Sequence, residues 1–315
     1  TPHIDALAAE GLTFSQGYAA NGTCAPSRAA LMSGRYGTRF GFEFTPTPTG
    51  FMPIVGLVGS TMDRPLLPPA ISNSQQANLS FNEMGMPPSE ITLAELLADQ
   101  GYHTVHIGKW HLGDEAWYPP GQGYDENRGG CDYGQPPSYF DPYNQPKHRH
   151  PMIRAGIPSL PGRQKGEFLT HREADEAVQL IRQWKDQPFF INLGHYAVHT
   201  PIQAKKEKIQ KYIDKAKRLG LTQRFSQGTP VWKSMSRKQQ SAPAYAAMVE
   251  SMDENIGRLL KSLKKQKLEN DTLIIFFSDN GGLSTGSGPN MPTSCSPLRA
   301  GKGWLYEGGI RVPLI

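Results

Sequence analysis

Short stretches rich in β-branched, aromatic and other apolar residues alternate along the chain with stretches whose apolar residues recur every three or four positions. The short stretches are HTVHIG at 103–108, PFFINLG at 188–194 and TLIIFF at 272–277. Runs of this length, bounded by glycine or polar residues, are typical of strands that are covered on both faces of a parallel sheet. The pattern therefore predicts three such strands, the last of them fully buried.

The intervening segments carry the periodicity of amphipathic helices. Apolar residues recur at helical spacing in HIDALAAEG at 3–11, SEITLAELLADQGY at 89–102, HREADEAVQLIRQWKDQ at 171–187 and AYAAMVESMDENIGRLLKSLKKQ at 244–266. We expect Ser89 to be the N-cap of the second of these helices. A further helix is expected to begin at Ser27 and to end near Gly34, since serine is a favourable N-cap and glycine a common helix stop.

This alternation predicts an α/β fold with a central, mostly parallel sheet flanked by helices on both faces. A polar cluster follows each predicted strand: GKWHLG at 108–113, HYAVHTP at 195–201 and SDNGG at 278–282. In such sheets, ligands bind beyond the carboxyl ends of the strands. We therefore expect the three clusters to lie at one edge of the sheet.

The chain has 315 residues, enough for one large α/β domain or two ordinary ones, and we interpret residues 1–315 as parts of a single domain. Its 37% hydrophobic content supports a sizeable core. Two segments depart from the alternating pattern. Residues 45–90 are rich in Pro, Gly, Ser and Asn, and residues 203–240 are rich in lysine. We interpret the first as a substrate-shaping insertion and the second as a solvated helix and loop.

The charge of the chain narrows the range of partners. A net charge of +5 is compatible with an anionic substrate, but nucleic-acid binding needs a clustered basic patch with aromatic residues. No apolar run approaches the roughly 20 residues of a membrane-spanning helix. The first residues, TPHIDALAAEGLTF, are typical of a domain interior rather than of a signal peptide. We expect neither a nucleic-acid partner nor a membrane span.

The three cysteines, Cys24, Cys131 and Cys295, are too few for a disulfide scaffold. Cys131 and Cys295 either pair with each other or remain separate thiols. Cys24 stands one helical turn before Arg28, in CAPSR. A cysteine, an arginine, two lysines, two histidines and an Asp-Asn pair together suit a tetrahedral oxyanion held beside a hard cation. Asp and Asn oxygens favour calcium or magnesium, and no Cys/His cluster has zinc spacing.

The segment CAPSR followed by AALMSGRYGTR resembles the signature of the formylglycine-dependent type I sulfatases of the alkaline phosphatase superfamily. Further segments match that family in order: TPHIDALAAEG at 1–11, GYHTVHIGKWHLG at 101–113, HYAVHTP at 195–201, FFSDNGG at 276–282 and PLRAGKGWLYEGGIRVP at 297–313. The resemblance implies that Cys24 is oxidised to formylglycine by a maturation enzyme. The hydrated aldehyde is then the nucleophile that attacks the sulfur of a sulfate ester.

The resemblance also implies a metal site. Asp279, Asn280 and the oxygen of residue 24 are expected to bind one calcium ion, which polarises the sulfate. The family carries two more aspartate ligands on a strand before the segment that matches 1–11, and a smaller antiparallel subdomain after the segment that ends at 313. We therefore interpret the sequence as a fragment of a longer catalytic domain.

The remaining site residues receive roles from the same resemblance. Arg28 and Lys109 are expected to orient and stabilise the nucleophile, and His111 to be the base that releases sulfate. His199 and Lys302 are expected to bind sulfate oxygens and to assist the departing alcohol. For two neighbouring residues, packing and substrate binding remain open alternatives: His195 and Arg299.

A sulfated carbohydrate is the expected substrate. Aromatic residues of the long loops at 45–90 and 116–170 either stack on sugar rings or pack within the loops. The resemblance implies export to a periplasm, an extracellular space or a lysosome. Two alternatives remain: a phosphoester or phosphonate monoester hydrolase of the same superfamily, and an inactive homologue that binds sulfated glycans. The sequence leaves the oligomeric state open.

Overall fold

The computed structural model describes residues 1–42, 71–73, 76–78, 85–113, 115–148, 151–227, 234–286 and 290–315. Two compact units make up the chain. The sheet unit comprises Cys24–Gly134 and Gln187–Gly194, and the helical unit comprises Thr1–Thr23, Gln135–Asp186 and His195–Ile315. Most of the insertion expected at 45–90 lies outside the described residues. No helix in the described part of the chain is long and apolar enough to cross a membrane.

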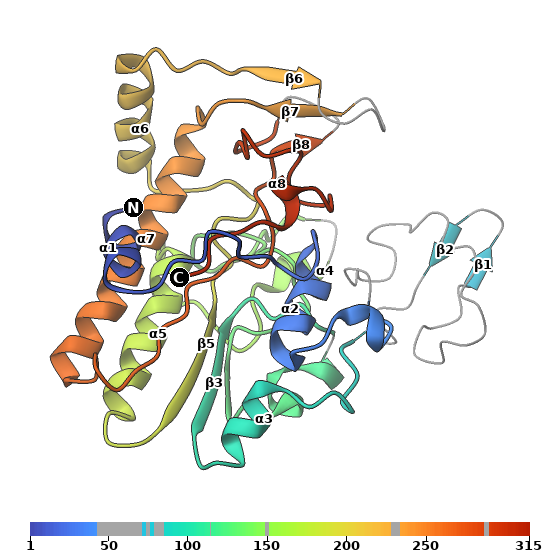
Figure 1. The fold of residues 1–315 in the computed structure, drawn as a ribbon, viewed down its shortest axis with the longest axis vertical. Coiled ribbons are helices and arrows are strands. Elements are labelled where there is room, and N and C mark those ends of the chain that lie inside the picture. Colours follow the sequence, from blue (N-terminus) through green and yellow to red (C-terminus); the bar gives the residue numbers. More distant parts are fainter. Residues whose placement is uncertain are drawn as a thin grey trace. The chain divides into compact units, whose positions relative to one another are not determined.

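A three-stranded parallel sheet with the order β4-β3-β5 forms the centre of the sheet unit (Figure 1). Its strands are β3 at His103–Gly108, β4 at Glu126–Arg128 and β5 at Phe189–Gly194. After its first residue β3 is buried throughout, with Val105 and Ile107 fully inaccessible. Two of the three predicted strands are therefore confirmed as strands, and they are parallel neighbours in register from His103↔Phe189 to Gly108↔Gly194. The expected burial of the second strand is wrong, since every residue of β5 is only half-buried.

Helix α2 of the sheet unit covers Cys24–Ser33. It begins three residues before the predicted cap at Ser27, because Pro26 is tolerated within the first helical turn, where its missing N–H costs nothing. One face of α2 packs into the core of the unit. The buried members of that core are Ala25, Ala29, Met32, Phe40, Phe42, Met86, Ala94, Trp110, Leu112 and Tyr124. Because α2 packs in the core along its length, the position of Cys24 at its N-terminus is fixed.

Helix α3 covers Leu93–Ala98, and its N-cap is Thr92 rather than the predicted Ser89. Thr92 Oγ1 accepts from the Glu95 backbone N–H at 3.1 Å, and the Glu95 carboxylate accepts from the Thr92 N–H at 2.6 Å. This reciprocal capping box satisfies two helix-terminal donors at once, which a serine three residues earlier does not do. The sheet unit also contains short elements: η1 at Gly37–Arg39, β1 at Ile71–Asn73, β2 at Gln76–Asn78, η3 at Glu115–Trp117 and η4 at Pro119–Gln122.

Four helices dominate the helical unit, and three of them pack on the longest one, α7 (Figure 1). They are α1 at Pro2–Glu10, α5 at Leu169–Gln183, α6 at Lys206–Arg218 and α7 at Pro243–Gln266. The predicted helices at 3–11, 171–187 and 244–266 are confirmed. No residue of α6 is buried, which agrees with the solvated helix expected within 203–240.

Short elements complete the helical unit. They are α4 at Pro151–Ala155, α8 at Glu307–Ile310 and an antiparallel sheet of β6 at Phe225–Gln227, β7 at Met235–Arg237 and β8 at Thr285–Gly286. The sequence pattern did not predict this sheet, because its strands are too short to establish an alternating period.

The expectation of a fully buried strand at 272–277 is wrong. Leu273 is 86% exposed and Ile275 is 65% exposed. Phe276 exchanges backbone hydrogen bonds with Ile315, both at 3.0 Å, and Phe277 forms an isolated bridge with Leu314. Among the described residues, 272–277 pairs in the manner of a strand only with Leu314 and Ile315. An apolar run becomes a buried strand only where neighbouring elements cover both of its faces.

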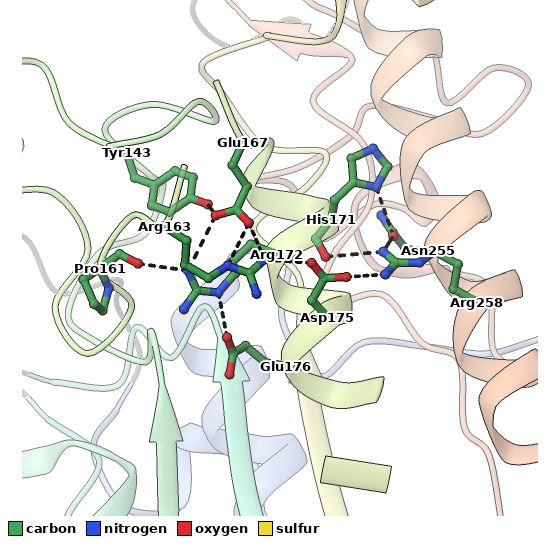
Figure 2. A network of polar contacts seen from close by, with 10 residues as sticks. All are labelled: Tyr143, Pro161, Arg163, Glu167, His171, Arg172, Asp175, Glu176, Asn255 and Arg258. Atoms are coloured by element: carbon green, nitrogen blue, oxygen red, sulfur yellow. Dashed lines mark hydrogen bonds and ion pairs between the residues drawn. The ribbon is translucent and has the colours of Figure 1, made fainter. Parts of the chain in front are cut away.

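A network of polar contacts holds α5 in the helical unit (Figure 2). On one side of the helix, the Arg172 guanidinium donates to Glu176 Oε1 at 2.6 Å and to the Pro161 carbonyl at 2.9 Å. On the other side, Asp175 accepts from Arg163 at 2.7 Å and pairs with Arg258 of α7. Helix α5 is thus held by polar contacts on two of its sides, and these contacts fix the position of the helix within the helical unit.

Candidate active site

Cys24 is the first residue of α2, and its side chain is buried at the end of the helix. Arg28, one turn later, donates from Nε to the Trp110 carbonyl at 3.0 Å and from its terminal nitrogen to the Lys109 carbonyl. A Cβ on Gly194 would lie 2.5 Å from that terminal nitrogen, so glycine is required there for the guanidinium to reach its acceptor. Arg28 therefore ties helix α2 to the loop that follows β3.

Lys109 and His111 stand on that loop, and each is only 3% exposed. The Lys109 N–H donates to the Gly194 carbonyl at 2.6 Å, and the His111 N–H donates to the Cys131 carbonyl at 2.9 Å. A Cβ on Gly134 would lie 2.5 Å from Cε1 of the His111 ring. The absence of a side chain at 134 therefore makes room for the imidazole beside Cys24.

The surroundings of His111 keep its imidazole neutral. Burial lowers its pKa from 6.5 to about 4, a hydrogen bond with the Cys24 side chain acts in the opposite direction, and the charges of Lys109 and Arg28 lower the pKa further. Its Nδ1 is buried and has no hydrogen-bond partner among the described residues. The structure thus brings four predicted residues of the sheet unit together: a neutral histidine bonded to Cys24 and flanked by two cations.

A second pair of predicted residues meets in the helical unit. Lys302 Nζ lies 2.6 Å from His199 Nε2, so the ammonium donates and Nε2 accepts. His199 Nδ1 then carries the hydrogen, 3.0 Å from Thr200 Oγ1 and 3.2 Å from the Thr200 carbonyl. The Thr200 hydroxyl donates onward to Gln135 Oε1 at 2.8 Å. Hydrogen bonds are thus donated in one direction, from Lys302 to His199, from His199 to Thr200 and from Thr200 to Gln135. The acceptor nitrogen of His199 lies toward the lysine.

The loop with the predicted metal ligands also belongs to the helical unit. Lys302 is tied to it, because its backbone N–H donates to the Gly282 carbonyl at 2.9 Å. Asn280 Nδ2 donates to the Gly281 carbonyl at 2.9 Å, whereas Asn280 Oδ1 is buried without a partner among the described residues. A buried amide oxygen without a donor is costly, and a bound hard cation would satisfy it. The carboxylate of Asp279 beside it is of the same ligand class.

The side chains of Asp279 and Asn280 are therefore of the kind that calcium prefers. Within the described ranges, no group of three His, Cys, Asp or Glu residues could hold a metal ion. Asp279 and Asn280 alone would thus supply only part of a ligand set, and a complete site would need oxygens from other segments. The third ligand, the oxygen of a formylglycine at residue 24, stays a prediction.

His195 and Arg299, for which packing and substrate binding were both open, have well-defined partners in the helical unit. His195 Nδ1 lies 2.6 Å from Glu173 Oε2 of α5. The Arg299 guanidinium lies over the ring of Tyr306, with Cζ 3.8 Å from the ring centroid. The sequence analysis did not single out Glu173. Glu173 could have been recognised in the sequence as an acidic residue on the apolar face of the helix predicted at 171–187. The cysteines Cys131 and Cys295, both within the described residues, are not joined by a disulfide bond.

Comparison with known proteins places these residues in a family context. The family model Sulfatase matches residues 1–315. The chain is 31% identical to the N-acetylgalactosamine-6-sulfatase of Homo sapiens over 332 aligned residues, which cover 100% of this chain and 51% of that protein. It is 29% identical to the steryl-sulfatase of Mus musculus over 385 aligned residues, which cover 100% and 53%. The chain spans about half the length of the curated relatives it matches.

Solved structures agree with this similarity. The crystal structure of Ps i-CgsB in complex with k-i-k-neocarrahexaose matches with a TM-score of 0.70 and 29% identity, covering 100% of this chain and 59% of that chain. The PsFucS1 sulfatase from Pseudoalteromonas sp. shares the fold, with a TM-score of 0.61 and 24% identity, covering 100% and 56%. These neighbours confirm the predicted α/β class, with a parallel sheet flanked by helices as in the alkaline phosphatase-like fold. The chain belongs to the sulfatase family.

Proposed function

We propose that the full-length protein hydrolyses a sulfate ester of a carbohydrate, with the residue at position 24 as a formylglycine nucleophile. The observation that carries this proposal is the environment of Cys24: a buried helix N-terminus, a neutral imidazole bonded to its side chain, and two cations beside that imidazole. Membership of the sulfatase family supports it. A structural cysteine has no need of such neighbours.

When formed, the hydrated aldehyde would supply one hydroxyl that attacks the sulfur as the alcohol departs, so that the sulfate is then carried on that oxygen. Loss of the proton of the second hydroxyl would re-form the aldehyde and expel the sulfate together with the first oxygen. His111 accepts the proton of the second hydroxyl. Its pKa of about 4 leaves it neutral, and therefore able to accept a proton, at neutral pH. Lys109 and Arg28 stabilise the negative charge that develops on the attacking oxygen, because both are held beside the nucleophile in a site from which water is largely excluded.

The pair of His199 and Lys302 acts on the sulfate and on the departing alcohol. The ammonium of Lys302 binds a sulfate oxygen and supplies a proton, and His199 orients that ammonium through the 2.6 Å contact. The bonds from Nδ1 to Thr200 fix the tautomer in which Nε2 faces the lysine. An alcohol of a sugar leaves poorly as an alkoxide, so proton delivery at this stage lowers the barrier.

A calcium ion would be held by Asp279, Asn280 and the oxygen of residue 24. It would polarise the sulfate and lower the cost of ionising the nucleophile. The buried, unpartnered Oδ1 of Asn280 supports this assignment, since oxygen ligands are those that calcium prefers.

Two kinds of observation support a carbohydrate sulfate as the substrate. Among the relatives and neighbours are a protein named N-acetylgalactosamine-6-sulfatase and a structure solved in complex with k-i-k-neocarrahexaose. The net charge of +5 is compatible with an anionic substrate. Oxidation of Cys24 by a maturation enzyme and export from the cytosol complete the proposal, both on the basis of the family.

The test is sulfate release by the full-length protein, coexpressed with a formylglycine-generating enzyme, on three substrate sets: defined sulfated sugars, an aryl sulfate and the matching aryl phosphate. The expected result is turnover of at least one sulfated sugar and loss of activity in Cys24→Ala. Faster hydrolysis of the phosphate would favour the phosphoesterase alternative. Binding of sulfated glycans without any release of sulfate, by protein whose residue 24 is unmodified, would favour the inactive homologue.

A further inference from the structure

The loop that carries His199 is held by two buried side chains of the helical unit. Glu173 of α5 is fully buried, and its Oε2 lies 2.6 Å from His195 Nδ1, while its Oε1 accepts from the Tyr196 backbone N–H at 3.3 Å. The hydroxyl of Tyr139 donates to the Tyr196 carbonyl at 2.6 Å and lies 3.0 Å from the His199 carbonyl. The backbone on both sides of the bend before His199 is therefore fixed.

We infer that Glu173 is a positioning residue for His199, with Tyr139 as its partner on the other side of the loop. The inference rests on the proposed function, in which His199 orients the proton donor Lys302. A carboxylate that is fully removed from water is costly unless both of its oxygens are bonded. Here the two oxygens of Glu173 accept hydrogen bonds from His195 and Tyr196, the first two residues of this loop. These bonds offset the cost of burying the carboxylate only when the loop has the observed conformation.

The hydrogen-bond pattern makes the carboxylate specific at this position. The site presents two donors to residue 173, His195 Nδ1–H and the Tyr196 N–H, and a carboxylate supplies two acceptors. An amide supplies only one acceptor. The histidine cannot compensate by changing tautomer, because its Nε2 is already buried without a partner in the described part of the chain, and a hydrogen there would be a buried, unsatisfied donor. Glu173→Gln therefore loses at least one of the two bonds.

Helix α5 offers a matched control. Glu176 stands one turn after Glu173 and is also buried, but its carboxylate accepts from Arg172 instead of from the loop (Figure 2). Glu176→Gln therefore removes a buried charge from the same helix without touching the loop. A purely structural effect of removing a carboxylate from α5 appears in both variants, whereas a positioning effect on His199 appears only in Glu173→Gln.

The experiment compares two substrates in the full-length, matured enzyme. A sulfated monosaccharide needs protonation of its leaving alcohol, whereas 4-nitrophenyl sulfate releases a phenolate that leaves without it. Glu173→Gln and Tyr139→Phe are each expected to lower kcat on the sugar by about tenfold or more and on the aryl sulfate by about twofold or less. Glu176→Gln is expected to keep the wild-type ratio of the two rates. Adding Glu173→Gln to His199→Ala is expected to lower kcat no further.

Three outcomes decide the matter. An unchanged ratio in both Glu173→Gln and Tyr139→Phe overturns the inference, as does a further full loss in the double variant. If Glu173→Gln does not fold, Tyr139→Phe alone decides. A wild-type enzyme that releases no sulfate from either substrate refutes the proposed function instead. Crystal structures then test the positioning separately, since the Lys302–His199 contact of 2.6 Å should break in Glu173→Gln and persist in Glu176→Gln.

Discussion

His106, in the middle of β3, makes the sheet unit sensitive to acid. Its side chain is completely buried, and its pKa falls from 6.5 to about 3, chiefly through burial and then through the charge of Arg28, while hydrogen bonds to backbone carbonyls act in the opposite direction. Its Nε2 lies 3.2 Å from the Gly108 carbonyl, and its Nδ1 lies 3.0 Å from Asn192 Nδ2. The folded protein therefore holds a neutral imidazole with both nitrogens engaged.

The sign of the pH effect follows from the lowered pKa. Above pH 6.5 the histidine is neutral in both the folded and the unfolded chain, so it has no effect on the pH dependence. Below pH 6.5 the unfolded chain binds a proton that the folded chain does not bind until about pH 3. Stability is therefore lost at about 1.4 kcal/mol per pH unit across this window, and the loss amounts to about 5 kcal/mol at its acid end.

His106→Gln removes the titrating group but keeps a donor for Gly108 and an acceptor for Asn192. Urea unfolding of the full-length protein between pH 4 and 7 measures the result. The slope of the unfolding free energy against pH is expected to fall by about 1.4 kcal/mol per pH unit below pH 6, whatever the absolute stability of the variant. Tyr124→Phe is the control, because Tyr124 packs edge-on against the same ring at 5.7 Å but does not titrate in this range.

The control should lose stability equally at every pH and keep the wild-type slope. Equal slopes in His106→Gln and wild type would refute the reasoning, since the buried imidazole would then be protonated in the fold. His111 adds a second loss of the same sign, from pH 6.5 down to about 4. That contribution is common to all three proteins, so it cancels in the comparison.

Three further predictions follow from single contacts. Cys24→Ala should abolish sulfate release while the unfolding midpoint in urea changes little, because the side chain supplies the nucleophile rather than much of the core; activity above background would contradict this. Thr92→Ala should lower the unfolding free energy by about 1 kcal/mol through loss of the capping box of α3, and unchanged urea unfolding would count against it. In Asn280→Ala, the rise of Tm on adding calcium should shrink or disappear relative to wild type; an undiminished rise would show that Asn280 Oδ1 is not a ligand.

Elements whose signal is contained within their own residues could be predicted from the sequence. The long helices and the strands at 103–108 and 188–194 are of this kind, because period and apolar content alone decide them. The end of a helix is decided by competition between candidates, and for α3 Thr92 prevails over Ser89 since only Thr92 has a glutamate three residues later to complete the box. The exposure of 272–277 depends on which other segments cover it, and no local pattern contains that information.

The chemistry of the candidate site shows the same division. His111 and His199 are both histidines that follow a predicted strand, so residue type and position in the sequence do not distinguish their roles. The structure separates them by their surroundings. His111 is buried between cations, and its lowered pKa of about 4 keeps the imidazole neutral, as its proposed role as a base requires. His199 turns its acceptor nitrogen to an ammonium at 2.6 Å, and a carboxylate far away in the sequence fixes the loop beneath it. Roles are thus set by partners that come from other segments. Glu173 was missed in the sequence because its inferred effect is exerted through another side chain, that of His199.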